Sequence, residues 1–111
     1  MERLQTYMKS EVSTQVLQPK RISFIVNPKA GTNLQKHICE SVEKHLNTDL
    51  FEYEFKFTER AGHARELAHQ SVTEGFDVVT AVGGDGSVNE VASALIGTDA
   101  VLGIIPAGSG N

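Results

Sequence analysis

One run of apolar and β-branched residues, 77–82, constrains the fold of this chain more than any other feature. It reads Asp-Val-Val-Thr-Ala-Val, and such a continuous pattern is typical of a strand that is covered on both faces. A glycine-rich segment, 83–86, ends the run. The residues that follow it have helical spacing, with Val88, Val91 and Leu95 at positions i, i+3 and i+7. A buried strand that passes through a glycine loop into an amphipathic helix predicts a sheet with helices on both faces.

Three further segments read as strands. Residues 22–26 form a compact apolar run that ends at Asn27-Pro28, which predicts a mostly buried strand followed by a turn. Residues 51–57 alternate strictly between aromatic and charged side chains, so we expect a half-exposed strand at the edge of the sheet. Residues 101–105 predict a fourth strand.

Two more amphipathic helices lie between these strands. Their apolar stripes are Leu34, Ile38, Val42 and Leu46 in the first helix, and Ala64, Leu67, Ala68 and Val72 in the second. Strands that alternate with helices imply right-handed crossovers and a parallel sheet. We therefore predict an α/β fold, a three-layer sandwich with a mostly parallel sheet in the strand order 2-1-3-4 and helices on both faces.

Composition limits the classes of function. The 111 residues suffice for one domain, and a formal charge of −4 disfavours nucleic-acid binding driven by net charge. No apolar run approaches the roughly 20 residues of a membrane span, and the single Cys39 suits a reducing compartment. We expect a cytoplasmic protein in which residues 1–20 are a loosely ordered extension and 21–111 are the domain.

Four polar segments that contain glycine each follow a predicted strand: 27–31 (NPKAG), 58–64 (TERAGHA), 83–90 (GGDGSVNE) and 106–111 (PAGSGN). In a parallel sheet the carboxyl ends of the strands share one edge, so these segments are expected to gather there and to line a ligand crevice. Glycines let the backbone approach a ligand closely, and the free amides at a helix start favour an anion. The pattern predicts a phosphate site that needs no lysine.

Simpler interpretations remain for parts of these segments. Thr32–Gln35 and Ser87–Glu90 each match a capping box and could do no more than start a helix. Lys29, Arg60 and Arg65 flank the glycine loops, where a solvated surface role is as good an explanation as a phosphate contact. Neither a P-loop nor a dinucleotide-binding fingerprint is present, and the histidines have no metal-ligand spacing.

From about Arg21 to Asn111 the sequence resembles the catalytic domain of the diacylglycerol-kinase-like lipid kinases, a family that includes bacterial lipid kinases, sphingosine kinases and ceramide kinases. The resemblance rests on the order and spacing of the four segments together, with the last one extended as Gly103-Ile-Ile-Pro-Ala-Gly-Ser-Gly-Asn111. NAD kinases share a related fold and the GGDG signature, but the segments 27–31 and 106–111 are more similar to the lipid kinases.

The resemblance implies a nucleotide-binding domain and a set of site residues. The residues that would line the ATP site are Asn27, Pro28, Lys29, Ala30, Gly31, Thr58, Gly84, Asp85, Gly86, Ser87, Val88, Asn89, Glu90 and Ser109. Asp85 would be the functional carboxylate, linked to Mg²⁺ and to the transferring phosphate through water. Ser87 stands where the family often has threonine, and it keeps the hydroxyl.

In the family a second, mostly β domain supplies the general base, the main metal-binding acids and much of the lipid pocket. This sequence contains no counterpart of it, so we expect an ATP-binding N-terminal domain of a lipid kinase that is inactive alone. Its partners would be ATP or ADP, with the lipid substrate and any peripheral membrane contact depending on the missing part. An NAD kinase-like enzyme and a non-catalytic nucleotide-binding module are the alternatives.

Overall fold

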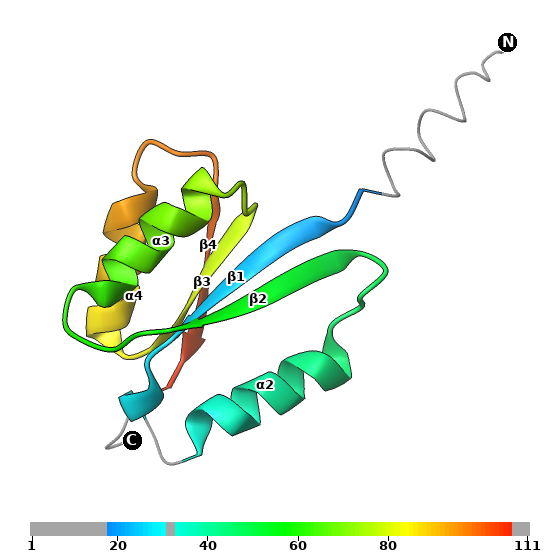
Figure 1. Cartoon of the computed structure of the whole chain (residues 1–111), viewed down its shortest axis with the longest axis horizontal. Helices are drawn as coiled ribbons and strands as arrows, with labels where there is room; N and C mark the ends of the chain where they lie inside the picture. Colours follow the sequence, from blue (N-terminus) through cyan, green and yellow to red (C-terminus); the bar gives the residue numbers. More distant parts are fainter. Residues whose placement is uncertain (1–17, 31–32, 108–111) are drawn as a thin grey trace, which may run out of the picture.

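The computed structural model describes residues 18–30 and 33–107 of the chain. Four strands alternate with helices along the sequence (Figure 1). Their bounds are β1 Lys20–Val26, the short 3₁₀ helix η1 Pro28–Ala30, α2 Leu34–His45, β2 Phe51–Phe57, α3 His63–Thr73, β3 Val78–Gly83, α4 Asp85–Leu95 and β4 Val101–Pro106.

The sheet is wholly parallel and has the order β2-β1-β3-β4, as the sequence predicts. Helices α3 and α4 pack side by side on one face, and α2 covers the other face beside β1 and β2 (Figure 1). The α/β three-layer architecture with helices on both faces is therefore confirmed. Because all four strands run in one direction, their carboxyl ends lie together at one end of the sheet.

Each face of the sheet has its own core. Alternate residues of β3 point to opposite faces, so Val79 and Ala81 pack under α3 and α4, while Val82 packs on the α2 side with Ile38. Val79, Ala81 and Val82 are completely buried, which confirms that this strand is central. The helix α2 lies against the aromatic side chains of β2 through its predicted apolar stripe, of which Ile38, Val42 and Leu46 are described.

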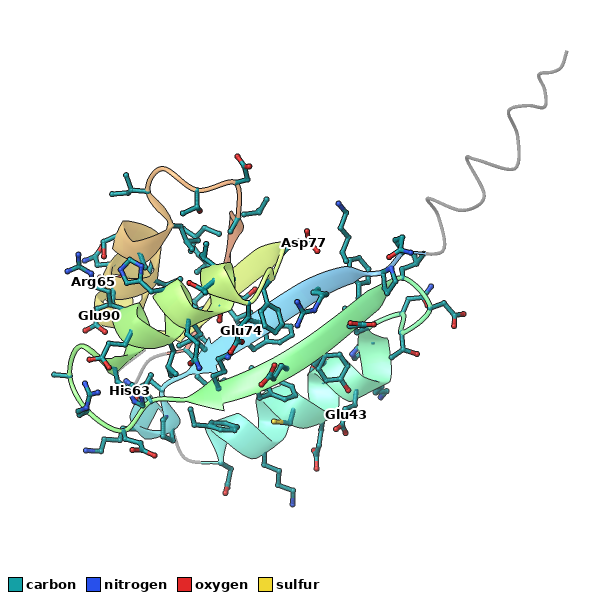
Figure 2. The ribbon with its side chains drawn as sticks, turned by 45° about the horizontal axis from the view of Figure 1, so that its top comes forward. Glu43, His63, Arg65, Glu74, Asp77 and Glu90 are labelled. Carbon is teal, nitrogen blue, oxygen red and sulfur yellow. The ribbon has the colours of Figure 1, made fainter. Side chains whose placement is uncertain are left out.

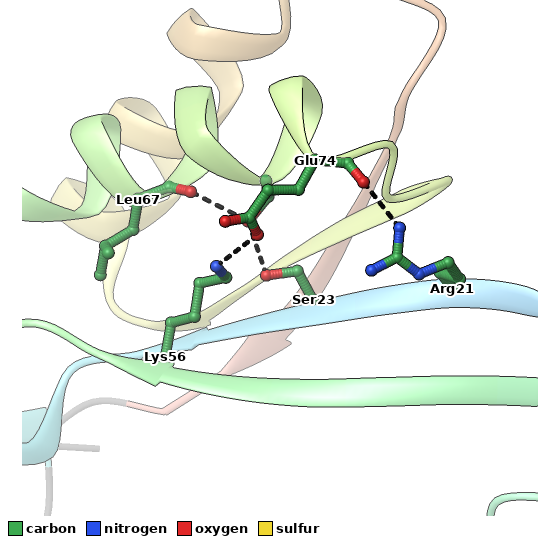
Figure 3. A network of polar contacts seen from close by, with 6 residues as sticks. Arg21, Ser23, Lys56, Leu67 and Glu74 are labelled. Carbon is green, nitrogen blue, oxygen red and sulfur yellow. Dashed lines mark hydrogen bonds and ion pairs between the residues drawn. The ribbon is translucent and has the colours of Figure 1, made fainter.

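The strand β2 lies at the edge of the sheet, but one of its charged residues is not solvated. Glu52 and Glu54 are exposed, as expected. Lys56 has a side chain only 9% exposed, because it lies over the ring of Phe76 and donates a hydrogen bond of 3.0 Å to Glu74 (Figure 3). The end of α3 thus covers part of the face that strict alternation predicts to be open.

The same region holds a pair of buried hydroxyls. Ser71 donates to the carbonyl oxygen of Leu67 at 2.9 Å, so Ser23 of β1 is the donor in the 2.8 Å contact between the two serine oxygens (Figure 3). Both serines are completely buried and both are satisfied. This pair ties α3 to the centre of the sheet.

The start of α4 differs from the sequence-based interpretation. A capping box at Ser87–Glu90 places the cap at Ser87, but the cap is Gly84 and the helix begins at Asp85. The capping-box interpretation of these residues is therefore wrong. Thr32, the other proposed cap, lies outside the described residues, and α2 has Asn33 in a left-handed conformation as its cap instead.

The first described element lies near residue 21, where the sequence predicts that the domain begins, and the division into an extension and a domain stays a prediction. The strand β1 starts at Lys20, one residue before position 21. Of the extension predicted for residues 1–20, residues 1–17 lie outside the described part of the chain. Within the described ranges, no helix has the length and apolar character required to cross a membrane.

Candidate functional site

A cleft of about 480 Å³ opens at the carboxyl ends of β1 and β2, beside the first turns of α4. Three segments that the sequence singles out form its walls. The lining residues are Asn27, Pro28, Lys29, Thr58, Glu59, Arg60, Ala61, Ala64, Gly86, Ser87 and Glu90. We call this the larger cleft.

The first wall is the turn that follows β1. Its backbone stays attached to the sheet, because the amide of Asn27 donates to the carbonyl oxygen of Val82 at 3.1 Å. The side-chain oxygen of Asn27 then accepts a hydrogen bond of 3.0 Å from the amide of Lys29. This local bond folds the chain into η1 and leaves Lys29 exposed at the rim of the cleft.

The second wall is the loop between β2 and α3. It is fastened to β1 at its start, where the amide of Thr58 donates to Val26 at 2.9 Å. Farther along, the amide of Glu59 donates to Nδ1 of His63 at 2.9 Å, so that nitrogen is unprotonated and acts as an acceptor. Arg60 does not reach into the cleft as a free cation, because its guanidinium makes two hydrogen bonds of 2.7 and 2.9 Å to Glu66.

The third wall is the start of α4. The first hydrogen bond of this helix joins the amide of Val88 to the carbonyl oxygen of Gly84 at 3.1 Å. The amides of the residues between them have no partner within the helix, as at any helix start. A side chain at Gly84 or Gly86 would meet no atom within 4 Å, so these glycines leave open space where a ligand could approach the backbone.

Gly83 differs from the two glycines after it. A Cβ atom there would lie 2.8 Å from Oγ of Ser87 and 3.1 Å from its Cβ. The glycine is thus needed for close packing between the end of β3 and the first turn of α4. This packing requirement explains why residue 83 is a glycine, and no contact with a ligand is needed to explain it.

A second cleft, of about 330 Å³, lies beside α4 and the end of β4. We call this the smaller cleft. Its lining residues are Gly83, Gly84, Asp85, Val88, Ile104, Pro106 and Ala107. Asp85 is the one charged residue among them, and Val88 and Ile104 give the cleft an apolar side.

Helical geometry explains how one continuous motif comes to line two clefts. Successive residues of α4 are about 100° apart, so residues three or four apart share a side. Asp85 and Val88 fall on the side of β4, whereas Gly86, Ser87 and Glu90 fall on the side of the loop before α3. Asn89 is exposed and lines neither cleft.

The predicted site residues are thus only partly brought together. Seven line the larger cleft: Asn27, Pro28, Lys29, Thr58, Gly86, Ser87 and Glu90. Gly84, Asp85 and Val88 line the smaller cleft, Ala30 belongs to η1, and Gly31 and Ser109 lie outside the described residues. The sequence-based set omits four residues that line the larger cleft, Glu59, Arg60, Ala61 and Ala64, although the sequence singles out the TERAGHA segment that holds them.

The pKa values of Glu66, which is bonded to Arg60 of the larger cleft, and of Cys39 on α2 are shifted by their surroundings. The hydrogen bonds from Arg60 hold the pKa of Glu66 below its usual value, and the charge of Arg60 acts in the same direction. On α2, burial raises the pKa of the Cys39 thiol, and Glu43 and Glu40 add to the effect. A thiol with a raised pKa is a poor nucleophile at neutral pH, in keeping with a packing role.

Metal ligands are sparse in both clefts. In residues 18–30 and 33–107, no group of three or more histidine, cysteine, aspartate or glutamate side chains could hold a metal ion. Asp85 therefore offers one carboxylate. One carboxylate fits Mg²⁺, which commonly keeps several waters and is bound by one or two carboxylates together with substrate phosphates.

The chain is similar to proteins named as diacylglycerol kinases. The family model described as diacylglycerol kinase catalytic domain matches residues 21–111. A diacylglycerol kinase of Bacillus subtilis is 35% identical over 95 residues, which are 83% of this chain and 31% of that protein. A diacylglycerol kinase of Staphylococcus saprophyticus is 37% identical over 94 residues, with 83% of this chain and 31% of that protein covered.

A solved structure agrees with this similarity. A crystal structure of a diacylglycerol kinase from Bacillus anthracis matches with a TM-score of 0.64 and 27% identity, and the match covers 81% of this chain and 34% of that one. The chain therefore spans about a third of the length of the relatives that it matches.

Proposed function

This chain belongs to the diacylglycerol kinase catalytic domain family, and from that premise we propose that it is the ATP-binding part of a lipid kinase. The reaction would move the γ-phosphate of ATP to the hydroxyl group of diacylglycerol or a related lipid. Because the chain spans about a third of its relatives, catalysis is proposed for a protein that holds this chain together with the remaining length.

The observation that carries the proposal is the position of the larger cleft at the start of α4. Unpaired amides and the positive end of the helix dipole favour phosphate at this point. Gly86 leaves the backbone open to a ligand, and Lys29 adds a cation at the rim. Together they support a nucleotide held by its phosphates against α4.

The chain's own residues would act by holding the nucleotide in place. Phosphoryl transfer depends on positioning and on the stabilisation of charge more than on covalent chemistry by the protein. Ser87 offers a hydroxyl beside the α4 amides, and Thr58 offers another from the opposite wall. These groups would orient the phosphates while the loop before α3 keeps water away from one side of the cleft.

We further propose that Asp85, which lines the smaller cleft, takes part in phosphoryl transfer. A carboxylate at the start of α4 would hold a hydrated Mg²⁺ ion beside the transferring phosphate. Mg²⁺, when bound, neutralises charge on the phosphates. Ile104 gives the smaller cleft an apolar side chain, which would suit a phosphate-accepting substrate that has an apolar part.

Nucleotide binding can be tested on the 111-residue chain. We expect ATP and ADP to bind weakly by titration calorimetry and to shift the amide resonances of Gly84, Gly86 and Ser87. Shifts confined to α2, with none in residues 83–90, would contradict the proposal.

Catalysis can be tested in a protein that contains this chain and the remaining length of its relatives. Asp85→Asn should leave folding nearly unchanged, because an exposed side chain is replaced by one of equal size. Phosphorylation of lipid by ATP and Mg²⁺ should fall by orders of magnitude. Diacylglycerol, a sphingoid base and NAD would be compared as acceptors, and a preference for NAD would overturn the lipid assignment.

A further inference from the structure

We propose that Glu90 is a positioning residue that sets the width of the larger cleft by holding the loop before α3 against α4. The proposal rests on the proposed function to this extent: the cleft is taken to be the nucleotide site. The contact itself can be tested without any nucleotide. It assigns Glu90 a role through another part of the protein rather than through a ligand.

The contact joins two walls of the cleft. Oε2 of Glu90, in the second turn of α4, accepts a hydrogen bond of 3.2 Å from the amide of Gly62 at the start of α3. In Figure 2, Glu90 of α4 and His63, which follows Gly62 at the start of α3, lie toward the same side of the molecule. Glu90 also lines the cleft, so loss of this bond would change the position of the cleft wall.

The other polar bonds of the loop lead elsewhere. Thr58 is bonded to β1, Glu59 to His63, and Arg60 to Glu66. Within residues 58–62, the bond from Gly62 to Glu90 is the one hydrogen bond that reaches α4. Without it, the loop would still be fastened to β1 and to its own helix, but its distance from α4 would not be fixed by any hydrogen bond.

Helix electrostatics favour this arrangement. Gly62 is the N-terminal cap residue of α3. No carbonyl oxygen of the same helix can accept a hydrogen bond from its amide. A carboxylate near a helix start is also stabilised by the helix dipole. Glu90 therefore meets a requirement of α3 while it is itself part of α4. Gly62 has a φ of 82°, and a Cβ there would meet no atom within 4 Å, so the glycine serves backbone conformation and not close packing.

The contact could instead stabilise α3 and have no effect on the cleft. Two variants of Glu90 separate these roles. Glu90→Ala removes the acceptor, whereas Glu90→Gln keeps an oxygen that can accept from Gly62 and removes the charge. Glu43 on α2 is exposed, and Glu43→Ala and Glu43→Gln are the matched controls for loss of charge.

Two measurements on the 111-residue chain test the proposal. The first is the hydrogen-exchange rate of the Gly62 amide without nucleotide, and the second is the dissociation constant of ADP by calorimetry. For Glu90→Ala we expect both to rise by about tenfold, as expected when a hydrogen bond to a charged group is lost. For Glu90→Gln we expect a rise of less than about threefold, and for the Glu43 variants none.

The outcomes separate failure of this inference from failure of the proposed function. If the unchanged chain binds no ADP, the proposed nucleotide site fails, and the exchange rate of Gly62 still decides whether the contact exists. If Glu90→Ala weakens ADP binding with no change in Gly62 exchange, Glu90 acts on the nucleotide directly and the inference is wrong. Faster exchange with unchanged ADP affinity would also overturn it, because the contact would then be structural alone.

Discussion

The two clefts on either side of α4 are built from one stretch of sequence, yet they differ in chemistry. The larger cleft is polar and carries Lys29, Arg60, Glu59 and Glu90 in its lining, so its charged groups balance. The smaller cleft has Asp85 and otherwise glycine and apolar residues. The difference shows that consecutive residues can line two clefts of different chemistry when they lie on different sides of a helix.

The difference in chemistry suggests that the two clefts have different roles, and substitutions in each cleft can test this. If the nucleotide occupies the larger cleft, substitutions there should change its affinity, and substitutions in the smaller cleft that leave Asp85 unchanged should not. The two clefts also share a structural element, the packing of Gly83 against Ser87, which should affect both. The following predictions run from the largest expected effect to the smallest.

The shared packing is the first target. Gly83→Ala would place a Cβ atom 2.8 Å from Oγ and 3.1 Å from Cβ of Ser87, so the Ser87 side chain must rotate and the end of β3 or the start of α4 must shift. We expect the free energy of unfolding to fall by about 2 kcal/mol, within the usual cost of overpacking. Urea denaturation measures this change. In a chain that already carries Ser87→Gly the crowding atoms are absent, so Gly83→Ala should then lower the free energy of unfolding by less; an equal decrease relative to Ser87→Gly alone would show that the packing is not the cause.

The second prediction compares glycines of the two clefts. Gly86→Val should fill open space in the larger cleft and raise the dissociation constant of ADP by about tenfold or more, a loss of roughly 1.4 kcal/mol. Gly84→Val fills space in the smaller cleft and should change it by less than about twofold. Calorimetry on the two variants gives the comparison. A larger effect at Gly84 would reverse the assignment of the clefts.

How far the sequence predicts this architecture depends on the kind of signal. The central position of residues 77–82 and the edge position of residues 51–57 followed from burial alone, since a continuous apolar run needs two covered faces and an alternating run needs one. The burial of Lys56 was not predictable in the same way. It depends on Phe76, which follows α3 and is distant from Lys56 along the chain.

The candidate site shows a similar limit. Its position at the carboxyl ends of the strands followed from the parallel order, but the division of residues 84–90 between two clefts requires knowing where α4 begins. The capping-box signature pointed to Ser87, and the helix begins at Asp85 instead. The cap is Gly84, three residues before Ser87, and a shift of three residues turns a helix by about 300°, so the sides of the helix could not be assigned from the sequence.

The third prediction concerns the cation at the rim of the larger cleft. Lys29→Gln should weaken ADP binding by about threefold, because an exposed cation contributes modestly to the attraction of phosphate and is screened by salt. The exposed Lys36 on α2 provides the control in Lys36→Gln. Affinities would be measured at low and high salt. An equal effect of the two variants would show that only net charge matters and that Lys29 has no local role.

The smallest expected effect is the acid sensitivity of the Arg60–Glu66 pair, which lies on the larger cleft and has no counterpart in the lining of the smaller one. The hydrogen bonds from Arg60 lower the pKa of Glu66 in the folded protein. Such a pair stabilises the fold above the ordinary pKa of glutamate, and the contribution is lost as the pH falls through the lowered pKa. Both side chains are more than half exposed, so the effect on stability should be small.

Carboxyl resonances of Glu66, followed from pH 7 to pH 2, should give a titration midpoint that rises toward the usual glutamate value in Arg60→Gln. The same variant leaves the Glu59 to His63 hydrogen bond in place, so an unchanged midpoint would mean that the pair does not form in solution and that Arg60 is available to a ligand in the larger cleft.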